Sequence, residues 1–168
     1  FELINNNSNR NELLVEKFKI DGKNTLIEGS VFFIDNTIRN IEFNSFRFLK
    51  NDISLNLESN FYNPYNVNKN IKIRIRGNEL DLSFLDIKKT KSQLRNINID
   101  LDINVEKFYY INNTNFNKAN LIGKFNNVWQ SLKFNGIFEE GGELSINLRP
   151  QNNKRHFTII SSNSGKAL

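Results

Sequence analysis

The sequence predicts an all-β fold, an antiparallel meander of about ten strands with one short helix. Three runs alternate apolar and polar residues, at 53–57, 71–75 and 97–105. Successive side chains of a strand point to opposite faces of a sheet, so each run predicts a strand with one apolar and one solvated side. The longest run places Ile, Leu and Val at every odd position from 97 to 105.

The other strands are predicted from apolar stretches that lie between turn signals. Asp21-Gly22 is a two-residue hairpin signal, and Asn126-Asn127 and Gly141-Gly142 mark two later turns. These boundaries predict further strands at 13–20, 25–34, 38–48, 119–125, 128–138, 143–148 and 155–160.

One segment departs from the period of two. Leu80, Phe84 and Ile87 recur at helical spacing, and Asn78 precedes them as a suitable N-cap. The acidic Glu79 also favours a helix N-terminus. We therefore expect a short helix at about 79–88, lying against one edge of the sheet.

Length and composition limit the class of protein. The chain has 168 residues, 38% of them hydrophobic, and no run approaches the roughly 18 apolar residues of a membrane span. Cysteine is absent, which excludes disulfides and thiolate metal sites. We expect residues 1–168 to form a single β-rich segment of a longer, elongated protein.

Candidate chemical residues are few. His156 is the only histidine, and Asp100 and Asp102 share one face of a predicted strand, as an exposed polar side requires. The net charge of +5 favours anionic partners, but the stripe of Lys72, Arg74 and Arg76 also suits an exposed strand face. No phosphate-binding loop, nucleophile elbow or paired histidine motif occurs. We expect neither an enzyme, nor a metal or other cofactor, nor a nucleic-acid partner.

Three stretches carry a resemblance. Residues 77–82 read Gly-Asn-Glu-Leu-Asp-Leu, residues 134–144 read Phe-Asn-Gly-Ile-Phe-Glu-Glu-Gly-Gly-Glu-Leu, and residues 161–168 read Ser-Ser-Asn-Ser-Gly-Lys-Ala-Leu. They resemble AsmA-like bacterial envelope proteins of the YhdP type, over the C-terminal third of the chain and the predicted helix. The sequence departs from that pattern at Ser162 and Asn163, which replace an acidic pair, and at Ser164, which replaces Ala.

The resemblance implies a strongly curved, taco-like antiparallel sheet whose apolar groove carries phospholipid acyl chains between membranes. It further implies a periplasmic location, with an inner-membrane anchor in a segment not present here. The alternation alone is equally compatible with a closed β-sandwich, a structural or adhesive domain with a dry core and no ligand. The candidate lipid-groove residues are Ile53, Leu55, Leu57, Ile71, Ile73, Ile75, Ile97, Ile99, Leu101, Ile103, Leu121, Phe125, Leu144, Ile146 and Leu148.

Overall fold

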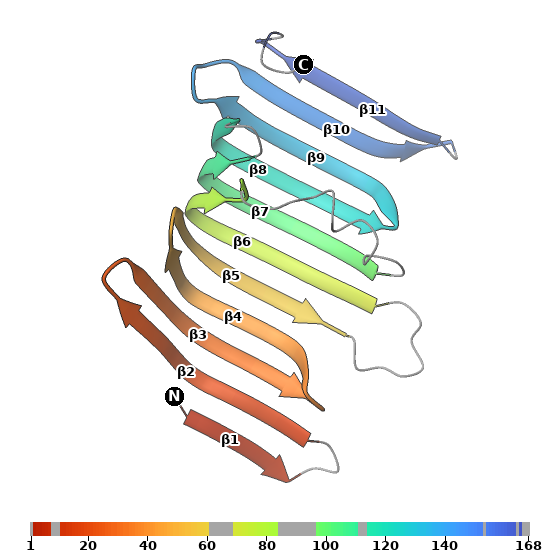
Figure 1. Ribbon diagram of the computed structural model, residues 1–168. Helices are drawn as coiled ribbons and strands as arrows, with labels where there is room; N and C mark the ends of the chain where they lie inside the picture. The colour runs from red at the N-terminus through yellow and green to blue at the C-terminus, as the bar shows by residue number, and fades with distance from the viewer. Residues whose placement is uncertain are drawn as a thin grey trace.

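The protein is all-β in its computed structural model, which describes residues 2–7, 11–60, 69–83, 97–110, 114–152, 154–163 and 165 (Figure 1). Its strands form one sheet in which spatial order equals sequence order. The strands are β1 (Glu2–Asn7), β2 (Asn11–Gly22), β3 (Thr25–Ile34), β4 (Thr37–Phe48), β5 (Asn51–Ser59), β6 (Lys69–Asp81), β7 (Ile97–Tyr109), β8 (Asn115–Asn126), β9 (Val128–Phe138), β10 (Glu143–Gln151) and β11 (Lys154–Ser161).

The sheet is open, with β1 and β11 at its two opposite edges. The predicted single curved sheet is therefore confirmed, with eleven strands. The alternative, a closed sandwich, is wrong, because every extensive contact between described strands joins neighbours of this one sheet. The strands bend together near one end, on the left of Figure 1.

Two local predictions need correction. The pair β6–β7 is parallel, whereas all other neighbouring pairs are antiparallel, so the sheet is mixed. The hairpin predicted at Asp21-Gly22 turns instead at Lys23 and Asn24, because Asp21 and Gly22 still pair within β2 and β3.

The helix expected at 79–88 does not begin where it was predicted. Residues 79–81 continue β6 as extended chain, and Leu80 lies beside Phe108 of β7 with 3% of its surface exposed. The backbone N–H of Asp81 donates to Asn51 Oδ1 at 2.8 Å, and that of Leu82 to the Tyr109 carbonyl at 2.9 Å. Pairing on both sides thus outweighs the local helical spacing. Residues 84–88 of the prediction lie outside the described residues.

Each of three adjacent strands, β6, β7 and β8, carries one extra residue at the same level of the sheet. The register of β5 against β6 skips Asn78, and that of β8 against β9 skips Lys118. Between them, β6, β7 and β8 stay in step, so each carries one surplus residue there. Such bulges bend a strand and increase its twist. Their position near the curled end explains why the sheet bends at that level.

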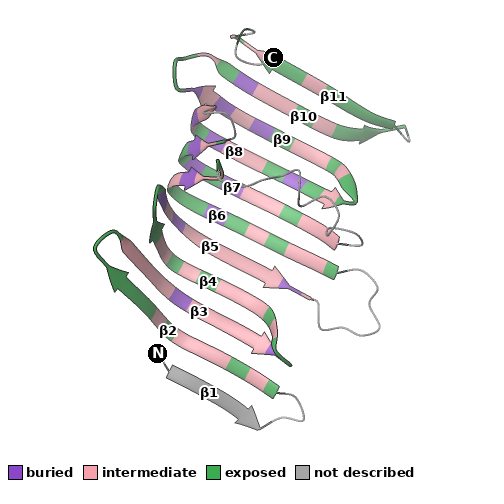
Figure 2. Ribbon diagram, in the orientation of Figure 1, coloured by how far each residue is buried: buried purple, intermediate pink, exposed green. Residues whose placement is uncertain are grey.

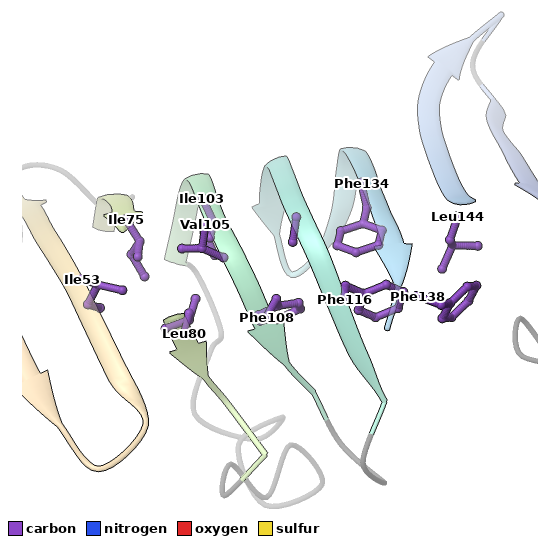
Figure 3. Close-up of a cluster of buried hydrophobic side chains, with 11 residues drawn as sticks. Ile53, Ile75, Leu80, Ile103, Val105, Phe108, Phe116, Phe134, Phe138 and Leu144 are labelled. Carbon is purple, nitrogen blue, oxygen red and sulfur yellow. The ribbon is translucent and has the colours of Figure 1, made fainter. Parts of the chain in front are cut away.

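The tightest packing lies at this curled end. Val105 is 1% exposed, and buried apolar side chains from β5 to β10 gather around it on one side of the sheet (Figure 3). The buried segments of the ribbon concentrate at the same end of β7, β8 and β9 (Figure 2). The cluster comprises Ile53, Ile75, Leu80, Ile103, Val105, Phe108, Phe116, Ala119, Phe134, Phe138 and Leu144.

Candidate functional site

All the apolar residues predicted to line a groove lie on one face of the sheet. Residues opposite each other in a sheet share a face. Leu55 is opposite Ile75, Ile75 lies beside Ile103, Ile103 is opposite Leu121, and Leu121 is opposite Phe134. One row of apolar side chains therefore crosses five strands, and we call this side the apolar face.

A second row follows the same rule two residues along. Leu57 is opposite Ile73, which lies beside Leu101. Farther across the sheet, Leu132 is opposite Leu148. The remaining candidates join these rows through the same register: Ile53, Ile71, Ile97, Ile99, Phe125, Leu144 and Ile146.

Burial of the apolar face falls from the curled end to the opposite end. Ile75 and Ile103 are 9% and 7% exposed, and Ile53 and Leu144 are equally buried. Every other candidate of the predicted set is half-buried, including Ile99 two rows from Ile103. The face thus has a packed end and an accessible end.

Phenylalanines fill the packed end. The ring of Phe116 lies 5.0 Å from that of Phe134 and 4.9 Å from that of Phe138, between ring centroids. Phe108 stacks on Phe116 at 6.4 Å. Side chains of neighbouring strands occupy this end themselves, whereas the stretch beyond it stays half-buried.

The apolar face also extends over β2–β4, where no candidate was predicted. Phe18 lies opposite Gly29, which lies opposite Phe43. Phe46 lies opposite Ile53, which joins this part to the predicted rows. The bulge between Val15 and Phe18 hides this part of the apolar face in the sequence. Both side chains lie on the apolar face, but they are three positions apart, which breaks the period of two. A search that allows one skipped residue finds this part of the face.

The other side of the sheet is polar and is charge-paired across β6 and β7. Arg76 Nη2 lies 2.5 Å from Asp102 Oδ2, and Lys72 and Arg74 lie beside Asp100 and Asp102 in the parallel register. The basic stripe of β6 therefore faces an acidic stripe on β7. Asp102 is thus the ion-pair partner of Arg76, and Asp100 lies beside Lys72 on the same solvated face. Lys72 Nζ and Arg74 Nη1 form their ion pairs with Glu58 of β5, at 3.8 and 3.1 Å.

Residues suited to metal binding are not brought together in the described part of the chain. No group of three or more His, Cys, Asp or Glu side chains with the arrangement of a metal site occurs there. His156 is exposed on β11, with Nδ1 3.4 Å from the Thr158 hydroxyl. Burial raises the pKa of the Tyr109 phenol, and the charge of Glu79 adds to the effect.

The apolar face is an open surface in the described structure. Shallow hollows lie beside Glu28 and Glu42 on β3 and β4, and at strand ends beside Gln130 and Lys154. Among the described residues, no helix is both long and apolar enough to cross a bilayer. Comparison of the chain with protein-family models, curated proteins and solved structures finds no match. The chemistry that the apolar face itself supports is the removal of apolar groups from water.

Proposed function

We propose that this chain carries phospholipid acyl chains along its apolar face, as one section of an elongated envelope protein that moves lipid between membranes. The observation that supports the proposal is a single sheet whose apolar face runs from β2 to β11 with no second described layer opposite it. Contiguous apolar surface on that scale marks a binding site in soluble proteins.

The energetics suit an acyl chain. Each CH₂ group costs about 0.8 kcal/mol in water, so a chain of about sixteen carbons costs on the order of 13 kcal/mol. Strands lie about 4.8 Å apart, so the nine intervals from β2 to β11 give a path of roughly 43 Å across the sheet. The predicted groove residues are all Ile, Leu or Phe, so they offer similar uncharged contacts at each step, which permits a chain to slide.

A structural or adhesive domain is the second candidate. The phenylalanine cluster around Phe116 favours it, because those rings satisfy one another without a ligand. The two functions differ in what the half-buried stretch around Leu101 does. In the lipid carrier this stretch contacts ligand, and in the structural domain it contacts only protein or water.

Lipid extraction from the purified chain distinguishes the lipid carrier from the structural domain. We expect phospholipid to be recovered in reproducible, near-stoichiometric amounts by organic extraction and mass spectrometry. Leu101→Gln, on the apolar face, should lower recovery several-fold. The matched control is Ile122→Gln, because Ile122 is 50% exposed on the polar face of the adjacent strand. Lipid-free wild-type protein, or equal loss in both variants, would favour the structural domain.

The proposed location follows from the resemblance to AsmA-like proteins. We place the protein in the periplasm, anchored to the inner membrane by a segment outside this sequence. Fractionation of cells that express the full-length protein tests this: recovery with cytosolic markers would contradict it.

A further inference from the structure

Strands β8 to β11 are strongly basic. In these four strands the only acidic residue is Glu143, at the first position of β10. Their basic residues are Lys118, Lys124, Lys133, Arg149, Lys154 and Arg155. This differs from β6 and β7, where Arg74 and Arg76 face Asp102 and its neighbours.

The excess charge is concentrated where β10 ends and β11 begins. Arg149, Lys154 and Arg155 are exposed, and the structure gives none of them an ion pair within the described residues. Glu143 lies at the far end of β10, paired with Ile137 of β9. Three cations at this end therefore have no described acid to neutralise them.

A hollow opens between these cations and the start of β9. Lys154 and Arg155 line it together with the amide side chains of Gln130 and Gln151, and Val128 forms an apolar wall. The Arg155 guanidinium donates through Nη1 to the carbonyl of Trp129 at 3.3 Å, a contact that reaches from β11 across β10 to β9. The hollow thus combines two cations with neutral hydrogen-bond donors and no acidic residue.

The hollow adjoins the accessible end of the apolar face. Arg155 is opposite Pro150 and two residues from Phe157, which is opposite Leu148. Phe157 is 56% exposed, and the Trp129 ring packs on Phe125 at 5.5 Å. A cation therefore stands at the margin where the apolar side chains of β8–β11 come to an end.

We propose that this hollow binds the phosphodiester headgroup of an anionic glycerophospholipid whose acyl chain lies on the adjoining apolar face. The proposal rests on the proposed function and adds the lipid class. A zwitterionic headgroup brings its own cation into a site that already has an excess of them, whereas an anionic headgroup such as phosphatidylglycerol does not. Planar guanidinium and ammonium groups are the usual partners of lipid and other phosphates.

Competition between two lipids of identical acyl chains tests the proposal. The purified chain is exposed to an equal mixture of dioleoyl phosphatidylglycerol and dioleoyl phosphatidylcholine, and bound lipid is extracted and quantified by mass spectrometry. A cation near an anionic lipid favours binding roughly fivefold. We expect wild-type protein to favour phosphatidylglycerol by roughly 25-fold for the two lining cations, and Lys154→Gln with Arg155→Gln to remove most of that preference.

The controls separate local charge from net charge and from folding. Lys23→Gln with Lys118→Gln removes the same charge elsewhere and should keep the wild-type ratio, and Arg155→Lys should retain most of it. Circular dichroism checks that each variant is folded. An equal ratio of the two lipids on wild-type protein, or the same ratio in both double variants, would overturn the headgroup site while leaving lipid carriage intact. Recovery of neither lipid would refute the proposed function itself, and this site with it.

Discussion

Two aspartate substitutions on β7 measure where the apolar face is open. Ile99 and Val105 lie on the same strand and the same face, at opposite ends of the burial gradient. Ile99 is half-buried, beside Ile71, whereas Val105 is 1% exposed between Gly77 and Ala119. If the face is accessible at Ile99, a carboxylate there stays hydrated and the protein stays folded. At Val105 the carboxylate is buried without a partner.

The expected losses follow from burial. Full burial of a branched aliphatic side chain stabilises by about 1.5–3 kcal/mol, so half-buried Ile99 contributes on the order of 1 kcal/mol. Asp in a strand costs up to about 1 kcal/mol more, which gives a total of about 2 kcal/mol for Ile99→Asp. An uncompensated buried charge costs about 3–5 kcal/mol and the lost apolar burial about 1.5–3 kcal/mol, so Val105→Asp should cost about 6 kcal/mol.

Urea unfolding and lipid recovery on the same samples provide the assay. Ile99→Asp should remain folded with lower lipid recovery, and Val105→Asp should unfold at a much lower urea concentration. For a chain of this size, the difference of about 4 kcal/mol corresponds to roughly 8–16 °C in Tm. If Ile99→Asp is as unstable as Val105→Asp, the face is closed at Ile99 and the reasoning fails there.

Three further predictions concern the packed end and its margin. Phe116→Ala should cost about 3–5 kcal/mol in urea unfolding, whereas Phe157→Ala, at a ring that is 56% exposed, should cost far less; equal losses would contradict a packed cluster. Gly77→Ala should lower the midpoint of urea unfolding more than Gly141→Ala does. Both glycines have positive φ, but a Cβ at 77 would lie 2.6 Å from the Cα of Ile53 in β5, while one at 141 meets nothing within 4 Å. The reverse order of the two midpoints would argue against the tight bulge. Burial raises the pKa of Tyr109 above its ordinary value of 10.0, so the stability linked to its neutral form is complete below pH 10 and is lost as the pH rises through the folded pKa; ultraviolet titration of wild type against Tyr109→Phe checks this, and ionisation at or below pH 10 would contradict it.

The sequence predicts most of the strands because the period of two is a local property. Two strands, Thr25–Ile34 and Val128–Phe138, have the predicted boundaries. Within them and in the strictly alternating runs, each residue's face is decided by its own position and by burial of its neighbours. No distant information is needed to place such a residue on the apolar face.

What the sequence does not predict depends on pairing between strands. Alternation is the same for parallel and antiparallel partners, so the parallel pairing of Lys72 with Asp100 could not be anticipated from either strand alone. The bulges are also missed, because they break the period of two within a strand. Val105 and Phe108 are both buried although they are three positions apart. The helical spacing at Leu80 predicts a helix only as long as the pairing of β6 with β5 and β7 is not known.

The bulged row at the level of Asn78 and Lys118 offers a reason why the apolar face is packed at one end and accessible at the other. A flat sheet exposes its whole apolar side, and a sheet closed on itself hides all of it. Bending three strands at one level brings Phe108, Phe116 and Leu80 together there, which supplies stability without a second layer among the described strands. The residues beyond the bend then contribute less to the stability of the fold. A face divided in this way suits exchange of an apolar ligand, because occupancy of the accessible end can change while the packed end keeps the sheet in shape.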